Sequence, residues 1–77
     1  MITTLDRVST ILRQQAPEVE VTEIVPEHRI QDLGIDSLTF VDILLKIEKD
    51  FAVEFSDDEL AAVESVQDIL DLVAQKA

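Results

Sequence analysis

One serine stands where the sequence predicts the start of a helix, and its hydroxyl is the chain's strongest candidate for chemistry. Ser37 follows the run DLGID of residues 32–36, in which Gly34 permits backbone angles that other residues avoid. Asp36 and Ser37 are both good N-cap residues, but only one of them can cap. If Asp36 caps, the Ser37 hydroxyl is free beside the positive end of the helix dipole. A phosphate ester at that point would be stabilised by backbone N–H groups and by the dipole.

Catalysis by the Ser37 hydroxyl itself is not expected. A serine nucleophile needs a base and donors for the oxyanion, and the only histidine, His28, lies nine residues upstream in a loop. The residues at the flanking positions are Ile35 and Thr39 rather than the two glycines of a nucleophile elbow. We therefore expect no catalytic residue, and we expect His28 to be a solvated loop residue.

The acidic residues near Ser37 lack the spacing of a calcium-binding loop. An EF-hand loop that began at Asp32 would place Gly34 at its third position and Ile43 at its twelfth, where an oxygen ligand and a glutamate are required. A dedicated metal site is therefore not expected. Loose binding of divalent cations by the acidic residues 57–59, or by the acidic residues of the helix expected at 37–51, stays open.

The length and composition are those of one small domain over residues 1–77. Hydrophobic residues make up 47% of the chain, which is enough for a single core. No cysteine is present, so a thiol would have to arrive on a cofactor. The apolar runs are too short to span a bilayer, and the first residues do not form a secretory leader. The expected location is therefore the cytoplasm.

The charge of the chain is strongly negative, with 17 acidic and 6 basic residues and a net charge of −11. Nucleic acids and anionic membranes would repel such a protein, so neither is an expected partner. Basic protein surfaces would attract it, although a need for solubility would also explain the acidity. We expect a monomer whose fold tightens with salt, divalent cations or mild acid, because each of them reduces its self-repulsion.

Hydrophobic periodicity predicts an all-α fold, a small four-helix bundle with three main helices and one short helix. The expected helices cover residues 3–15, 37–51, 57–62 and 66–75. Thr3 or Thr4 can cap the first helix and Pro17 ends it, whereas a capping box at 56–59 begins the short helix. Residues 16–36 form a long first loop, whose scattered valines and isoleucines predict that it packs onto the helices.

The helix expected at 37–51 has more apolar surface than one core-facing side needs. At about 100° per residue, one face gathers the expected core residues Phe40, Ile43, Leu44, Ile47 and Phe51. A second apolar strip lies beyond that face and consists of Leu38, Val41 and Leu45. An exposed apolar strip rimmed by charge is a candidate docking surface.

The sequence around Ser37 resembles the acyl carrier protein family, and the resemblance covers nearly the whole chain. The residues that carry it are LGIDSL at 33–38, then Val41, Glu48, Phe51 and Glu54. In that family, the serine of the Asp-Ser-Leu motif holds a covalent 4'-phosphopantetheine arm, whose thiol carries acyl groups as thioesters. The resemblance implies that Ser37 is the attachment residue and that Gly34, Asp36 and Leu38 belong to the cofactor site.

The resemblance also implies the partners of a carrier that is not itself an enzyme. A phosphopantetheinyl transferase would supply the arm from coenzyme A. Acyl-processing enzymes such as a ketosynthase, an acyltransferase, a ketoreductase or a dehydratase would then meet the loaded carrier. Contact with them would come from Leu38, Val41 and Leu45, and charge for basic enzyme surfaces would come from Asp42 and Glu48.

In fatty-acid carriers the acyl chain can enter between the helices. The candidate liners of such a space are Phe40, Leu44, Ile47, Val63, Ile69 and Leu72. The same residues would also serve as ordinary core residues.

Some positions depart from the family pattern and favour a specialised pathway. Thr39 follows the motif where an acidic residue is usual, Lys46 and Lys49 interrupt the acidic run, and Phe40 and Ser56 replace a small residue and a proline. Fatty-acid synthesis, polyketide synthesis and other dedicated acyl assembly stay open as pathways. A second hypothesis also stays open, in which the chain is a non-enzymatic acidic helical protein-interaction module and Ser37 is only a helix cap.

Overall fold

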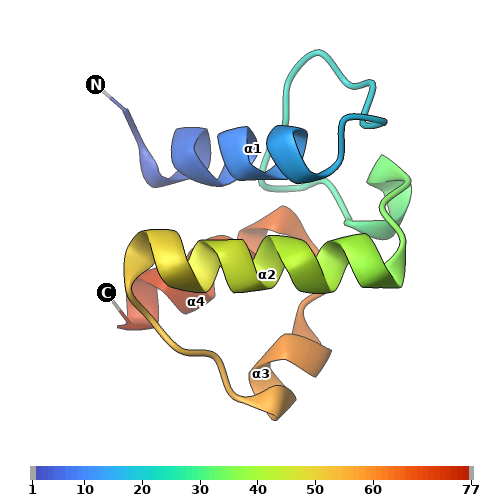
Figure 1. Ribbon diagram of the computed structural model, residues 1–77. Helices are drawn as coiled ribbons and strands as arrows, with labels where there is room; N and C mark the ends of the chain where they lie inside the picture. The colour runs from blue at the N-terminus through green and yellow to red at the C-terminus, as the bar shows by residue number, and fades with distance from the viewer. Residues whose placement is uncertain (1, 77) are drawn as a thin grey trace.

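The computed structural model describes residues 2–76, and within them the fold is all-α (Figure 1). The elements are α1 (Thr4–Gln15), a short 3-10 turn η1 (Gln31–Leu33), α2 (Ser37–Phe51), α3 (Asp57–Ala62) and α4 (Val66–Lys76). The four expected helices are confirmed, each with ends within one residue of the expected ones. Over residues 2–76, extended backbone pairs only at a single bridge between Arg29 and Ser65, and no helix there is long and apolar enough to cross a membrane.

Side-chain caps fix where the helices begin. The Thr3 hydroxyl accepts from the Asp6 amide at 3.1 Å, and the Asp6 carboxylate accepts from the Thr3 amide at 3.0 Å. Thr3, rather than Thr4, therefore caps α1. The expected capping box before α3 is confirmed, because Ser56 and Glu59 exchange hydrogen bonds of the same kind at 3.2 and 2.8 Å. Each box satisfies amide groups that a helix start leaves unpaired.

One hydrophobic core joins α1, α2 and α4 with the first loop. In Figure 1, α1 and α2 run side by side in opposite directions and α4 lies behind α2, and α1 packs against both of them. The largest fully buried side chains are Val8, Leu12, Ile43, Ile47, Val66 and Ile69. The expected core face of α2 is confirmed for Ile43, Leu44 and Ile47, whereas Phe40 and Phe51 are half-buried at its edge. The short helix α3 contributes no fully buried residue.

The first loop, residues 16–36, packs onto the helices as predicted. It buries Ala16, Val19, Ile24, Ile30, Leu33 and Ile35. On its N-terminal side, the Arg13 guanidinium donates to the carbonyl oxygens of Val21 and Thr22 at 2.9 and 3.1 Å. A loop of this length is therefore ordered by its own apolar residues and by an anchor from α1.

The end of the loop also completes the start of α4. The carbonyl oxygens of Pro26 and His28 accept from the amides of Gln67 and Val66, both at 2.9 Å. His28 is half-buried, and its Nδ1 accepts from the Val25 amide at 3.2 Å. The expectation of a solvated histidine was wrong, since this side chain and its carbonyl hold the loop in shape and tie it to α4.

Candidate functional site

The N-terminus of α2 settles which residue caps the helix. Asp36 is the N-cap in an extended conformation, and its Oδ1 accepts from the Thr39 amide at 2.8 Å. Ser37 is the first residue of α2, its side chain is exposed, and its hydroxyl makes no hydrogen bond with any residue between 2 and 76. The capping task thus falls to the carboxylate, which leaves the hydroxyl free for modification.

The electrostatics of this helix start favour an ionised cap. The Thr39 amide donates to the Asp36 carboxylate and lowers the pKa of that carboxyl below its ordinary value of 3.8. An ionised carboxylate at the N-cap also complements the helix dipole. Ser37 therefore lies on a helix end that is held in a fixed geometry at neutral pH.

Gly34 makes the turn that delivers the chain to α2. It ends η1 in the left-handed region, with φ of 77° and ψ of 21°, and its amide donates to the Gln31 carbonyl at 3.2 Å. A Cβ at this position would meet nothing within 4 Å. The glycine is therefore required by the backbone angle and not by a lack of space.

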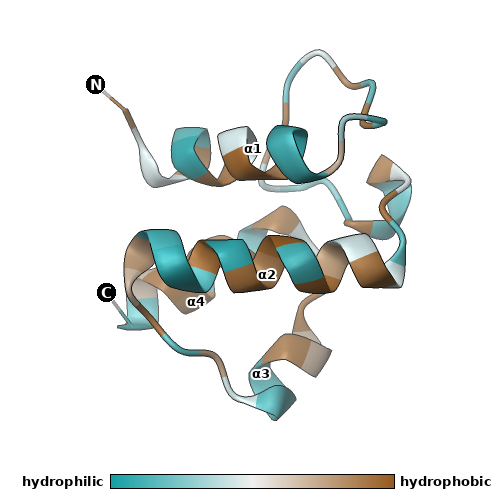
Figure 2. Ribbon diagram, in the orientation of Figure 1, coloured by the Kyte–Doolittle hydropathy of each residue, from teal (hydrophilic) through white to brown (hydrophobic). Residues whose placement is uncertain are grey.

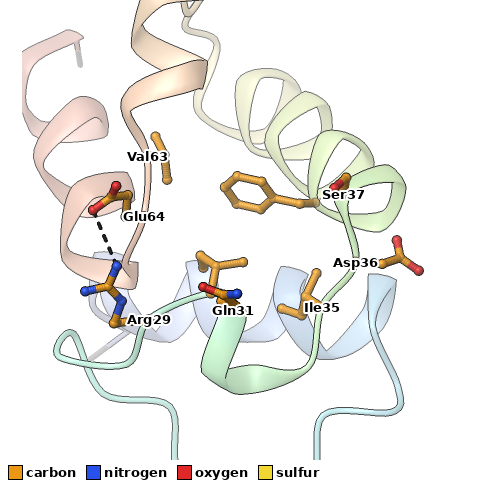
Figure 3. Close-up of a pocket in the computed structure, with 9 residues that line it drawn as sticks. Arg29, Gln31, Ile35, Asp36, Ser37, Val63 and Glu64 are labelled. Atoms are coloured by element: carbon orange, nitrogen blue, oxygen red, sulfur yellow. Dashed lines mark ion pairs between the residues drawn. The ribbon is translucent and has the colours of Figure 1, made fainter.

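A pocket of about 460 Å³ opens beside Ser37 (Figure 3). Its apolar walls are Ile30, Ile35, Phe40 and Val63, and its polar rim is Arg29, Gln31, Asp36, Ser37 and Glu64. Figure 3 shows the Arg29–Glu64 ion pair, with a distance of 3.6 Å, on the side away from Ser37 and Asp36. The main chain closes the same side, because the Ile30 amide donates to the Glu64 carbonyl at 2.9 Å.

The residues that were expected to line a space for the acyl chain do not surround one common cavity in the structure. Phe40 and Val63 line the pocket beside Ser37, whereas Ile47 and Ile69 have no exposed surface and belong to the closed core. Leu44 borders a hollow of about 230 Å³ between α2 and α3. The remaining candidate, Leu72, lines a separate depression beside α4.

The expected strip on α2 is exposed. Leu38, Val41 and Leu45 show 82%, 51% and 50% of their surface to solvent, and Asp42 beside them is exposed as well. Figure 2 shows hydrophobic residues recurring along α2, with hydrophilic residues between them. The strip begins next to Ser37, so a protein bound on it would lie close to the hydroxyl.

Glu48 differs from its expected role as a free surface charge. Its side chain is half-buried, and Oε2 accepts from the Phe55 amide at 2.8 Å. This hydrogen bond holds the connection between α2 and α3 against the end of α2. We therefore leave Glu48 out of the docking surface.

Sequence reasoning did not find the far side of the pocket. Arg29, Gln31 and Glu64 reach it from the first loop and from the α3–α4 connection. No local pattern marks these residues, because only the folded loop brings them together. Within residues 2–76, no three acidic or histidine residues gather as metal ligands. Of the acidic residues 57–59, Glu59 is committed to Ser56 and to Lys76.

Comparison with known proteins shows which family the sequence matches. Residues 6–73 match the family described as a phosphopantetheine attachment site. Acyl carrier protein 3 of Ralstonia nicotianae is 41% identical over 68 residues, which cover 88% of this chain and 78% of that protein. An acyl carrier protein of Thermosynechococcus vestitus is 36% identical over 73 residues, which cover 94% and 89%.

Solved structures share the fold. An acyl carrier protein from Thermotoga maritima superposes with a TM-score of 0.80 at 24% identity, over 91% of this chain and 81% of the other. The acetyl actinorhodin acyl carrier protein from Streptomyces coelicolor gives a TM-score of 0.76 at 26% identity, over 97% and 91%. The helical-bundle fold is thus shared with carrier proteins.

Proposed function

The chain belongs to the acyl carrier protein family, and from this membership we propose that Ser37 is the residue that carries its 4'-phosphopantetheine arm. Proteins of this family hold acyl intermediates for biosynthetic enzymes and are carriers rather than catalysts. The observation that supports Ser37 most directly is its exposed, unbonded hydroxyl at the start of α2.

The residues around Ser37 suit a covalently attached phosphodiester. Asp36 caps α2 and keeps the hydroxyl out of the capping bond, and Gly34 turns the loop so that Ser37 lies at an exposed corner. Leu38 follows with 82% of its surface exposed and offers apolar contact to the transferase or to the arm. When the arm is attached, its terminal thiol supplies the thioester linkage that a chain without cysteine lacks.

The competing hypothesis is a non-enzymatic acidic interaction module in which Ser37 serves only as a helix cap. The hydrogen bond from the Thr39 amide to Asp36 removes that task from Ser37. The hypothesis would then leave the free hydroxyl without a role, so we favour the carrier.

Intact mass separates the two functions. The protein is incubated with coenzyme A and a promiscuous phosphopantetheinyl transferase. Wild type should gain the mass of one arm and Ser37→Ala should gain none. Ser9→Ala, in the middle of α1, is the matched control and should be modified as wild type is. An unmodified wild type, or an arm on Ser37→Ala, would remove the proposed attachment site.

We further propose that the strip of Leu38, Val41 and Leu45, with Asp42, is where partner enzymes dock. The partners include the phosphopantetheinyl transferase and acyl-processing enzymes such as a ketosynthase, an acyltransferase, a ketoreductase or a dehydratase. Val41 and Leu45 expose about half of their surface, and nothing inside the protein requires this exposure. Apolar residues at the centre of a docked surface contribute most of the affinity.

Charge substitutions in the strip test this docking surface. Val41→Glu or Leu45→Asp should lower kcat/KM of an acyl-processing enzyme for the loaded carrier by about tenfold or more, since one or two kcal/mol of interface contact is lost. The helical circular dichroism signal should stay unchanged, because both positions face solvent. Unchanged turnover in both variants would exclude the strip from docking.

We propose that residues 1–77 act as a single carrier domain, because one core cluster unites the helices. A monomer is favoured because two copies, each with a net charge of −11, would repel each other. We place the protein in the cytoplasm, where coenzyme A can supply the arm. We assign it to fatty-acid or polyketide-type synthesis, and Thr39, Lys46 and Lys49 favour a specialised pathway.

A further inference from the structure

The exposed strip of α2 ends on a lysine. At about 100° per residue, Leu38, Leu45 and Lys49 fall within about 40° of one another on the helix, and Lys49 is exposed. Lys49 lies eleven residues after Leu38, which is about 16 Å along the axis at 1.5 Å per residue. A partner that follows the strip from Ser37 along α2 therefore meets apolar side chains first and a cation at the end.

Within residues 2–76, Lys49 is the basic residue whose side chain has neither a hydrogen bond nor an ion pair. Between residues 2 and 76, the other five all have internal contacts. Arg7 donates to the Asp50 carbonyl and stacks on Phe51, Arg13 donates to Val21 and Thr22, Arg29 pairs with Glu64, Lys46 with Asp50, and Lys76 with Glu59. In the same range, neither a hydrogen bond nor an ion pair involves the Lys49 amine.

The carboxylates next to Lys49 in the sequence are engaged elsewhere. Glu48 accepts from the Phe55 amide at 2.8 Å, and Asp50 pairs with Lys46 at 3.6 Å. The Lys49 ammonium group, unpaired within residues 2–76, is a positive charge in a protein with a net charge of −11, and it lies in line with the docking strip.

We propose that an acyl-processing enzyme of this carrier presents a carboxylate to Lys49 while it covers Leu38 and Leu45. The inference rests on the docking strip described above and adds the chemistry of its partner. Complementary charge at the rim of an interface sets register and association rate, so this contact would favour enzymes with an acidic residue at that distance over enzymes that are basic along the whole contact. A second copy of the chain is a poor occupant, because both copies are strongly acidic.

The proposal is tested by whether KM rises or falls when the charge of Lys49 is reversed. The probe is a ketosynthase that elongates the wild-type acyl-protein, and KM for the carrier is measured at low and at 0.5 M NaCl. With a carboxylate opposite Lys49, Lys49→Glu should raise KM about fivefold or more at low salt with kcat unchanged, and high salt should shrink the difference. With a basic enzyme surface opposite Lys49, the same change should lower KM, and that result would overturn the proposal.

A matched variant separates local charge from net charge. Gln14→Glu with Gln15→Glu adds the same two negative charges on exposed positions of α1, and KM should change less than twofold. An equal rise in KM for this variant would mean that Lys49 acts only through net charge, which would also overturn the proposal.

Carbodiimide coupling identifies the partner atom directly. Wild-type carrier and the ketosynthase should give a cross-link between Lys49 and an aspartate or glutamate of the enzyme, located by mass spectrometry. Replacing that residue with lysine should restore KM for Lys49→Glu. Coupling only at other lysines would contradict the assignment. Intact mass measures arm attachment separately from KM for the ketosynthase, so a failed carrier function and a failed partner assignment are distinguishable.

Discussion

At the scale of single residues, the carboxylate of Asp36 decides what Ser37 can do. Because Asp36 takes the hydrogen bond from the Thr39 amide, the hydroxyl one residue later has no structural duty. The two neighbouring polar residues thus divide the tasks of capping and modification. Local preference alone cannot choose between them, since aspartate and serine are nearly equal caps. The choice follows from which residue the Gly34 turn leaves in the extended conformation before the helix.

The role of Asp36 predicts an acid-dependent loss of stability. Its pKa is lowered in the folded protein, so the stabilisation is present above the ordinary value of 3.8 and is lost as pH falls through the lower folded value. The pKa of Glu59 is shifted in the same direction, because hydrogen bonds from the Ser56 amide and from Lys76 lower it. Asp36→Asn keeps an acceptor for the Thr39 amide but does not titrate.

Urea unfolding followed by circular dichroism between pH 5 and pH 2 measures this effect. The free energy of unfolding of wild type should fall relative to that of Asp36→Asn as pH decreases through the lowered pKa of Asp36, because only wild type loses an ionised cap. Identical slopes would mean that the cap does not contribute to the pH dependence.

At the scale of elements, local sequence signals predict the positions of the helices but not the contacts that the connecting loops make with them. The capping box at Ser56 and the apolar periodicity of α2 act within a few residues, so the sequence was enough to place them, whereas it left the cap of α1 open between Thr3 and Thr4. The hydrogen bond from the Phe55 amide to Glu48 and the pocket wall at Arg29 and Glu64 arise from the path of the loops. These contacts depend on long-range packing, which no spacing along the chain encodes.

The end of α2 is another feature that the local sequence does not predict. Ala52 adopts φ of 56° and ψ of 45°, a left-handed conformation that glycine usually occupies at helix ends. Its amide donates to the carbonyls of Glu48 and Lys49. An alanine gives no sequence signal for such a turn, and the local strain is of order 1 kcal/mol.

Two opposite substitutions test this strain. Ala52→Gly should raise the free energy of unfolding by about 0.5 kcal/mol, because relief of strain exceeds the added entropy of the unfolded chain. Gly34→Ala should lower it by about 0.5 kcal/mol for the converse reason, although the site has room for the methyl group. Urea midpoints with unchanged m-values would measure both effects. A destabilised Ala52→Gly would show that Ala52 is not strained.

At the scale of the whole molecule, net charge opposes the compact fold. A chain of 77 residues with a net charge of −11 repels itself, and a small domain has little stability to spare. The three ion pairs within residues 2–76 are all partly or largely exposed, and exposed pairs contribute little. The buried side chains of the core are all apolar in that range, so hydrophobic burial has to offset the repulsion.

This balance predicts that salt stabilises the protein. Raising NaCl from 10 mM to 300 mM shortens the screening length from about 30 Å to below 10 Å, which is less than the 20 Å thickness of the molecule. The melting temperature should rise by several degrees, because about 1 kcal/mol shifts it by about 4–8 °C in a domain of this size. Glu20→Gln with Glu23→Gln, at exposed loop positions, changes the net charge from −11 to −9. This variant should melt higher than wild type at 10 mM NaCl and should gain less from added salt. If its salt dependence equalled that of wild type, general salting effects on the apolar core, and not charge repulsion, would govern the stability.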